Sequence, residues 1–149
     1  MDRKIYTSTD HPSDQPIFLH SEGSYTLNWP MFIMFFCQLA ANNGGRTPIA
    51  DTRQILKYLP DKIVNRFAEK GILYVRNYHQ GIGLSWQDVF QTNDKCDVEQ
   101  FCQQNQISWN WIGEDRLRTW QHRSAIQTHP ISSERLWFNH GVFFHPTSL

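Results

Sequence analysis

The stretch His20-Ser21-Glu22-Gly23-Ser24-Tyr25, followed by Gly44-Gly45-Arg46-Thr47-Pro48-Ile49-Ala50-Asp51, is the most informative part of the chain. His20 and Glu22 are two residues apart, and on a β-strand such residues project to the same face, where they can hold one metal ion together. An imidazole and a carboxylate are two of the three ligands in the facial triad that binds non-haem Fe(II). A second histidine is the ligand that the rest of the chain has to supply.

Length and composition set mild limits around this pair. The 149 residues suggest a single domain, and 40% hydrophobic with 14% aromatic residues is enough for a core. Fourteen basic and fourteen acidic side chains cancel, which argues against a nucleic-acid or membrane partner. The apolar run 31–37 is too short to cross a bilayer.

The start of the chain and its cysteines indicate the compartment. The first residues are polar and acidic, so no secretory leader is predicted there. The three cysteines, Cys37, Cys96 and Cys102, are odd in number and lack C-x-x-C spacing. We expect reduced thiols in a cytoplasmic protein, with two of them in the core.

The pattern along the chain predicts short strands mixed with short helices. Residues 1–16 are expected to be loop or extended chain. Asp51 or Thr52 can cap a helix that Pro60 ends, and a second helix with a buried face of Ile63, Val64 and Phe67 stops at Gly71. Further helices are predicted over 86–90 and 94–103, the latter with Val98, Phe101 and Cys102 on one side. Strands are predicted over 17–22, 31–39, 72–77, 107–111, 117–126 and 136–138.

Several motifs in the same order carry a resemblance to a known family. They are Tyr6-Thr-Ser-Thr9, Asp14-Gln-Pro-Ile17, the His20/Glu22 pair with Ser24-Tyr25, Gly44-Gly45-x-Thr47-Pro-Ile-Ala-Asp51, Leu73-Tyr-Val-Arg-Asn-Tyr78, Trp86-Gln-Asp-Val-Phe-Gln-Thr92, Asp115-Arg-Leu-Arg118 and Trp137-Phe-Asn139. With them the chain resembles the Fe(II)/2-oxoglutarate-dependent oxygenases of the TauD/TfdA family, and within it the hydroxylase-like branch found with syringomycin-type biosynthesis. The resemblance spans nearly the whole chain.

The resemblance implies a fold and a set of roles. The fold is mainly β with short helices (α+β), as part of a double-stranded β-helix, or jelly roll. His20 and Glu22 would be the first two iron ligands, Thr47 would donate a hydrogen bond to the 2-oxoglutarate carboxylate, and Asn139 would face the substrate. The implied reaction uses Fe(II), 2-oxoglutarate and O2 to hydroxylate an unactivated C–H bond of a small, amino-acid-like substrate.

The chain also departs from the family pattern. Gly23, Arg46 and the pair His140-Gly141 replace residues that are usual at those positions. The family's distal iron histidine and its 2-oxoglutarate-binding arginine would fall downstream of Leu149, and relatives have sequence before Met1. We therefore expect residues 1–149 to be a partial, central piece of the family domain.

Another histidine within the chain is the alternative source of the third ligand. The candidates are His11, His79, His122, His129, His140 and His145. His140 and His145 lie in an aromatic segment and can rotate toward a cavity, although they precede the strand that carries the ligand in the family. A turn is the expected setting of His129, and His122 is expected at the surface or as a satisfied interior histidine.

Each of the other motifs can also be explained by structure alone, without a functional role. A lone H-x-E is most often a polar strand end, the Gly44-Gly45 turn with Thr47 can be a plain loop, and Trp86, Trp109 and Trp111 are expected to pack. Two functions therefore remain open. One is an oxygenase polypeptide, completed by more of its own reading frame or by a complementing chain or homo-oligomer; the other is a non-catalytic remnant or binding module that holds metal weakly.

Overall fold

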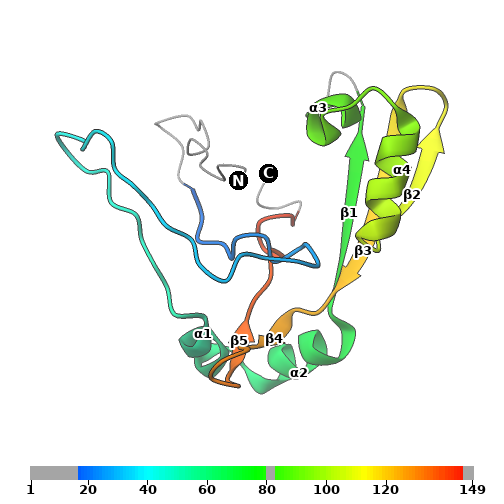
Figure 1. Cartoon of the computed structure of the whole chain (residues 1–149). Coiled ribbons are helices and arrows are strands. Elements are labelled where there is room, and N and C mark those ends of the chain that lie inside the picture. The colour runs from blue at the N-terminus through cyan, green and yellow to red at the C-terminus, as the bar shows by residue number, and fades with distance from the viewer. Residues whose placement is uncertain (1–16, 80–82, 146–149) are drawn as a thin grey trace.

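Helices and short antiparallel strands alternate along the chain in the computed structural model, which describes residues 17–79 and 83–145 (Figure 1). The predicted loop over 1–16, with His11, lies outside the described residues. In chain order the elements are α1 (Thr52–Tyr58), α2 (Asp61–Lys70), β1 (Ile72–Tyr78), α3 (Trp86–Phe90), α4 (Lys95–Gln104), β2 (Ser108–Ile112), β3 (Arg116–Arg123), β4 (Ile126–Thr128) and β5 (Arg135–Trp137).

The helix boundaries follow the local signals in the sequence. Asp51 caps α1 by accepting a hydrogen bond from the backbone N–H of Arg53, and α1 ends just before Pro60. Asp94 caps α4 in the same way through Cys96. Gly71 follows α2 with φ 62°, and a Cβ added there would lie 2.5 Å from the carbonyl oxygen of Arg123. Glycine is therefore required where α2 turns into β1.

Strand β3 is the centre of a three-stranded antiparallel sheet of order β1-β3-β2. Ile72 pairs with Arg123 and Tyr78 with Leu117, while Trp111 pairs with Leu117 from the other side. Leu117, Thr119 and Arg123 are buried on β3 while Arg116 and Arg118 are exposed, so the strand keeps a period of two for most of its length.

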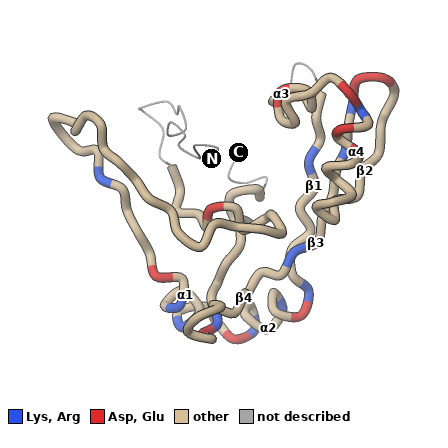
Figure 2. Tube along the Cα trace, in the orientation of Figure 1, with Lys and Arg blue, Asp and Glu red and all other residues tan. Residues whose placement is uncertain are grey.

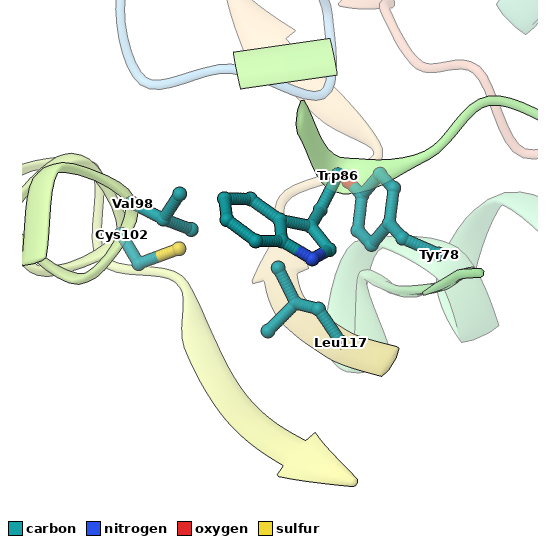
Figure 3. Packing of buried hydrophobic residues seen from close by; sticks show 5 residues of the cluster. All are labelled: Tyr78, Trp86, Val98, Cys102 and Leu117. Atoms are coloured by element: carbon teal, nitrogen blue, oxygen red, sulfur yellow. The ribbon is translucent and has the colours of Figure 1, made fainter. Parts of the chain in front are cut away.

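The main hydrophobic core lies between this sheet and helices α3 and α4 (Figure 3). It consists of Tyr78, Trp86, Val98, Cys102 and Leu117. Trp109 and Trp111 pack against it, and the rings of Trp86 and Trp111 meet edge to face with centroids 5.2 Å apart. The packing role predicted for these three tryptophans is confirmed.

A smaller second unit forms around the hairpin β4–β5. Helix α1 packs against β5, and Arg53 of α1 joins Asp51 to Glu134 through ion pairs of 2.8 and 3.1 Å. The ring of Phe67 on α2 meets that of Trp137 on β5 at 5.2 Å.

Two predicted strands are absent from the structure. Residues 17–22 run without strand structure into a turn, and residues 31–39 lack strand structure as well. The second prediction rested on an apolar run, but a buried strand needs neighbours that pair with it and cover both faces. No described strand pairs with residues 31–39, and Met34, Phe36 and Leu39 are about 90% exposed.

The surroundings of this apolar segment are nearly free of charge. Between Glu22 and Asp51 the only charged side chain is Arg46. Figure 2 shows the long tan excursion on the left that this stretch makes away from the sheets. The segment therefore presents an exposed apolar surface that has almost no charged side chains to oppose association with other molecules.

Three burial predictions also need correction. No residue of α2 is buried, and Ile63 is 40% exposed. On α4, Val98 and Cys102 are fully buried but Phe101 is 47% exposed. Only one of the cysteines, Cys102, is in the core; Cys37 and Cys96 are exposed.

The α+β part of the predicted fold class is confirmed. The described sheets have three and two strands, so they do not by themselves form the two facing sheets of a jelly roll. Within residues 17–79 and 83–145, no helix has the length and apolar character needed to cross a bilayer.

Candidate metal centre

His20 and Glu22 lie close together although neither is on a strand. His20 Nε2 is 3.6 Å from Glu22 Oε2, and the two side chains are 31% and 57% exposed. The turn that begins at Ser21 brings the two side chains together. Their proximity was predicted from the geometry of a strand, but a turn is what produces it.

The hydrogen bonds of His20 leave the nitrogen that faces Glu22 available. His20 Nδ1 is 2.8 Å from the carbonyl oxygen of Phe18. A carbonyl only accepts, so Nδ1 donates in this hydrogen bond, and Nε2 is the ring nitrogen that faces Glu22. Metal-bound histidines are commonly held in their tautomer by this kind of contact.

The donor spacing is compatible with a shared ion. Two donors each about 2.1 Å from one ion are roughly 3.0 to 3.6 Å apart for angles between about 90° and 120° at the ion. The separation of 3.6 Å is at the upper end of that range. Two donors of the types that non-haem iron uses are therefore present and fit, and a complete triad needs a third.

A buried hydrogen bond holds the turn immediately after this pair. Ser24 is 2% exposed, its backbone N–H donates to the carbonyl of Ser21 at 3.2 Å, and its Oγ lies 2.9 Å from His140 Nδ1. The backbone N–H of His140 in turn donates to the hydroxyl of Tyr74 on β1 at 2.8 Å. In Figure 1 the blue segment after residue 17 and the orange-red segment near residue 140 pass close to each other, as this hydrogen bond requires.

A second contact fixes the same turn to β3. The carbonyl oxygen of Tyr25 accepts hydrogen bonds from Gln121 Nε2 at 2.6 Å and from Arg123 Nε at 3.2 Å. The guanidinium of Arg123 also donates to the carbonyls of Asn105, Gln106 and His122. Four backbone carbonyls thus satisfy this buried cation, which has no carboxylate partner among the residues that the structure describes.

Burial dominates the pKa shifts around the turn. It lowers the pKa of His140 below the ordinary 6.5; positive charge on His20 lowers it further, while Glu22 and the backbone of Ser21 oppose the shift. Burial also raises the pKa of Tyr74, while the hydrogen bond from the His140 backbone N–H and the positive charge of Arg123 each lower it by less. The lowered pKa favours the neutral form of His140 near pH 7.

The other two predicted site residues are not brought to the pair. Thr47 is exposed in the excursion before α1, and none of the contacts described joins it to His20 or Glu22. Asn139 is 8% exposed; its Nδ2 donates to the carbonyl of Ala125 at 3.0 Å, and its Oδ1 accepts from the N–H of Gly141 at 3.0 Å. In this structure Asn139 braces the backbone around His140, and its substrate role stays a prediction.

The histidines considered as a third metal ligand have different surroundings in the structure. His140 is packed against His20, with ring centroids 5.1 Å apart. His122 bonds the carbonyl of Lys70, and His129 accepts backbone N–H groups in the β4–β5 turn, as expected for satisfied histidines. In the part of the chain that the structure describes, no three His, Cys, Asp or Glu side chains are grouped so that they could hold a metal ion.

Sequence reasoning missed the residues that support the pair. Ser24, Tyr74, Gln121 and Arg123 were assigned no role at the site, and His140 was considered only as a ligand. The available signal was weak: a serine two residues after a candidate ligand, and a histidine in an aromatic run, occur for many reasons.

Comparisons with known proteins agree with the family resemblance that the motifs indicate. Residues 2–149 match the family described as "Taurine catabolism dioxygenase TauD, TfdA family". The chain is 43% identical over 145 residues to the dapdiamide synthesis protein DdaC of Enterobacter agglomerans, covering 97% of this chain and 44% of that protein. It is 28% identical over 146 residues to a clavaminate synthase-like protein of Arabidopsis thaliana, covering 91% and 44%. The chain thus spans less than half the length of these curated relatives.

Proposed function

Because the chain belongs to the TauD/TfdA family of dioxygenases, we propose that it contributes the first two iron ligands, His20 and Glu22, of an Fe(II)/2-oxoglutarate-dependent dioxygenase. The observation that carries this proposal is the pairing of His20 Nε2 with Glu22 Oε2 at 3.6 Å, with His20 Nδ1 held by a backbone carbonyl. Imidazole and carboxylate are donor types that bind a divalent ion such as Fe(II).

Each residue has a definite task in the proposal. When bound, Fe(II) with 2-oxoglutarate and O2 supplies the oxidising chemistry that hydroxylates an unactivated C–H bond. His20 donates its lone pair, and Glu22 adds a negative charge that stabilises the metal. Thr47 donates its hydroxyl to the 2-oxoglutarate carboxylate, and Asn139 faces the substrate.

The proposal needs a third donor for the metal. The curated relatives are more than twice as long as the region matched here, so it can come from more polypeptide of the same chain or from a complementing chain. For the substrate we propose a small, amino-acid-like molecule. This class comes from the motif resemblance to the hydroxylase-like branch, and the relatives are described as a dapdiamide synthesis protein and a clavaminate synthase-like protein.

A non-catalytic remnant or binding module of the same family is the second candidate. It is favoured by the lack of any three-donor group within residues 17–79 and 83–145. Two protein donors alone hold a divalent ion weakly and exchangeably.

Anaerobic Fe(II) titration and 2-oxoglutarate turnover separate these candidates. We expect Fe(II) binding in the unmodified chain that His20→Ala and Glu22→Gln each weaken, while the control His129→Ala binds as before. Succinate formation that His20→Ala abolishes supports the dioxygenase; Fe(II) binding without succinate supports the binding module. Fe(II) affinity that is the same in all four proteins refutes the assignment of the metal pair.

A further inference from the structure

We propose that His140 is a positioning residue that holds His20 and Glu22 in the geometry needed for metal binding. This inference rests on the proposed function of the pair and adds a residue from the other end of the chain to it. His140 is 7% exposed and is separated from Ser24 by 116 positions, so the contact between them is a feature of the tertiary structure.

The first link runs from His140 to the backbone after Glu22. His140 Nδ1 and Ser24 Oγ are 2.9 Å apart in a buried hydrogen bond. Ser24 is two residues from Glu22 and closes the turn through its backbone N–H to Ser21. Fixing Ser24 therefore fixes the direction in which Glu22 leaves the turn.

The second link is a ring contact with His20 itself. The imidazoles of His20 and His140 have centroids 5.1 Å apart at an interplanar angle of 51°. The ring of Phe143 touches both, at 5.7 Å from His20 and 5.4 Å from His140. One side of the His20 ring is therefore bounded by packed aromatic rings, which limits its rotation.

The third link connects His140 to the rigid part of the fold. Its backbone N–H donates to the hydroxyl of Tyr74, which is 5% exposed on β1. Residues 17–22 have no strand of their own, so β1 and β3 are the nearest rigid supports available to the pair. A metal site with donors on irregular backbone depends on such supports for its affinity.

His140 is assigned to positioning and not to direct ligation. Its Nδ1 is already engaged by Ser24, and within the described residues it does not form a three-donor group with the pair. Loss of a supporting contact of this kind typically weakens metal binding by about 10- to 100-fold.

Co(II) titration of the whole chain, followed by the paramagnetic shifts of assigned histidine ring protons in NMR, tests this role. His140→Phe keeps a ring beside His20 and removes the bond to Ser24; Ser24→Ala removes the same bond from the other side. We expect each to weaken Co(II) binding about ten-fold, and the double variant to be no weaker than His140→Phe alone. His140→Asn, which retains a polar group near the position of Nδ1, is expected to recover most of the affinity.

Several outcomes would overturn the inference. Co(II) affinity in His140→Phe and Ser24→Ala equal to that of the unmodified chain would exclude positioning, provided that His20→Ala abolishes binding. Shifts of the His140 ring as large as those of His20, with Ser24→Ala unaffected, would make His140 a ligand instead. Binding that is absent in the unmodified chain, or unchanged in His20→Ala, would overturn the proposed metal pair and this inference with it. His129→Asn serves as the matched control, because its ring also accepts hydrogen bonds in a turn but lies in the β4–β5 hairpin.

Discussion

Ser24 Oγ lies 2.9 Å from His140 Nδ1, and this hydrogen bond joins the turn after the candidate metal pair to the C-terminal segment of the described chain. Both residues are buried, and His140 is joined in turn to Tyr74 on β1. The irregular segment with His20 and Glu22 is therefore held by the tertiary structure, and the stability of these supports can be tested directly.

Arg123 is expected to be a major support of the turn. Its side chain donates to four backbone carbonyls, including that of Tyr25, so Arg123→Met removes four hydrogen bonds made by a buried side chain. We expect a loss of about 2 to 4 kcal/mol in the free energy of unfolding, measured by urea denaturation. Arg118→Met is the matched control, because Arg118 is exposed on the same strand, and it should change stability by no more than about 0.5 kcal/mol. Equal effects of the two substitutions would contradict this account.

Gly71 is expected to tolerate alanine worse than another glycine with the same φ. Gly71 has φ 62° and Gly113 has φ 67°, but only at Gly71 would an added Cβ meet neighbouring atoms, at 2.5 Å from the Arg123 carbonyl. Gly113→Ala should cost about 1 to 2 kcal/mol from backbone strain alone, and Gly71→Ala clearly more. Thermal unfolding of both variants checks the order, and a smaller loss at Gly71 would show that the α2–β1 junction is not tightly packed.

Cys102 is expected to make the protein less stable in alkali. Burial raises the pKa of its thiol from 9.0 to about 11. The unfolded chain releases this proton first, so the contribution is fully present below pH 9 and is lost as the pH rises toward 11. The shift corresponds to a loss of at most about 3 kcal/mol across that window. Urea unfolding at several pH values should show a shallower decline in Cys102→Ala than in Cys37→Ala, whose thiol is exposed in the native chain; parallel declines would argue against the buried thiol as the cause.

The exposed apolar segment 31–39 is expected to promote association. Phe36 is 92% exposed, so Phe36→Lys should alter the free energy of unfolding by no more than about 0.5 kcal/mol while reducing self-association, measured by light scattering against concentration. Leu117→Ala provides the contrast, because Leu117 is 1% exposed and its truncation should cost about 2 to 5 kcal/mol. If Phe36→Lys associates as readily as the unmodified chain, another surface is responsible.

Local signals were sufficient for much of the fold. Such signals act within a few residues, and they include the cap at Asp51, the stop at Pro60, the glycine at 71 and the alternation in residues 107–111. Helices α1 to α4 and strands β1 and β2 begin and end close to the positions predicted from local sequence. Residues 31–39 show the limit of such reasoning, because an apolar run becomes a strand only when other strands pair with it.

The sequence by itself determined the family and the helices and predicted the pair His20 and Glu22, because these depend on residue identity and on neighbours along the chain. Only the tertiary structure decided what supports the pair: a serine bonded to a histidine 116 positions away, and a carbonyl bound by Gln121 and Arg123 of β3. The physical reason is that a hydrogen bond between distant segments depends on how those segments pack against each other, and no local pattern in the sequence identifies the partner.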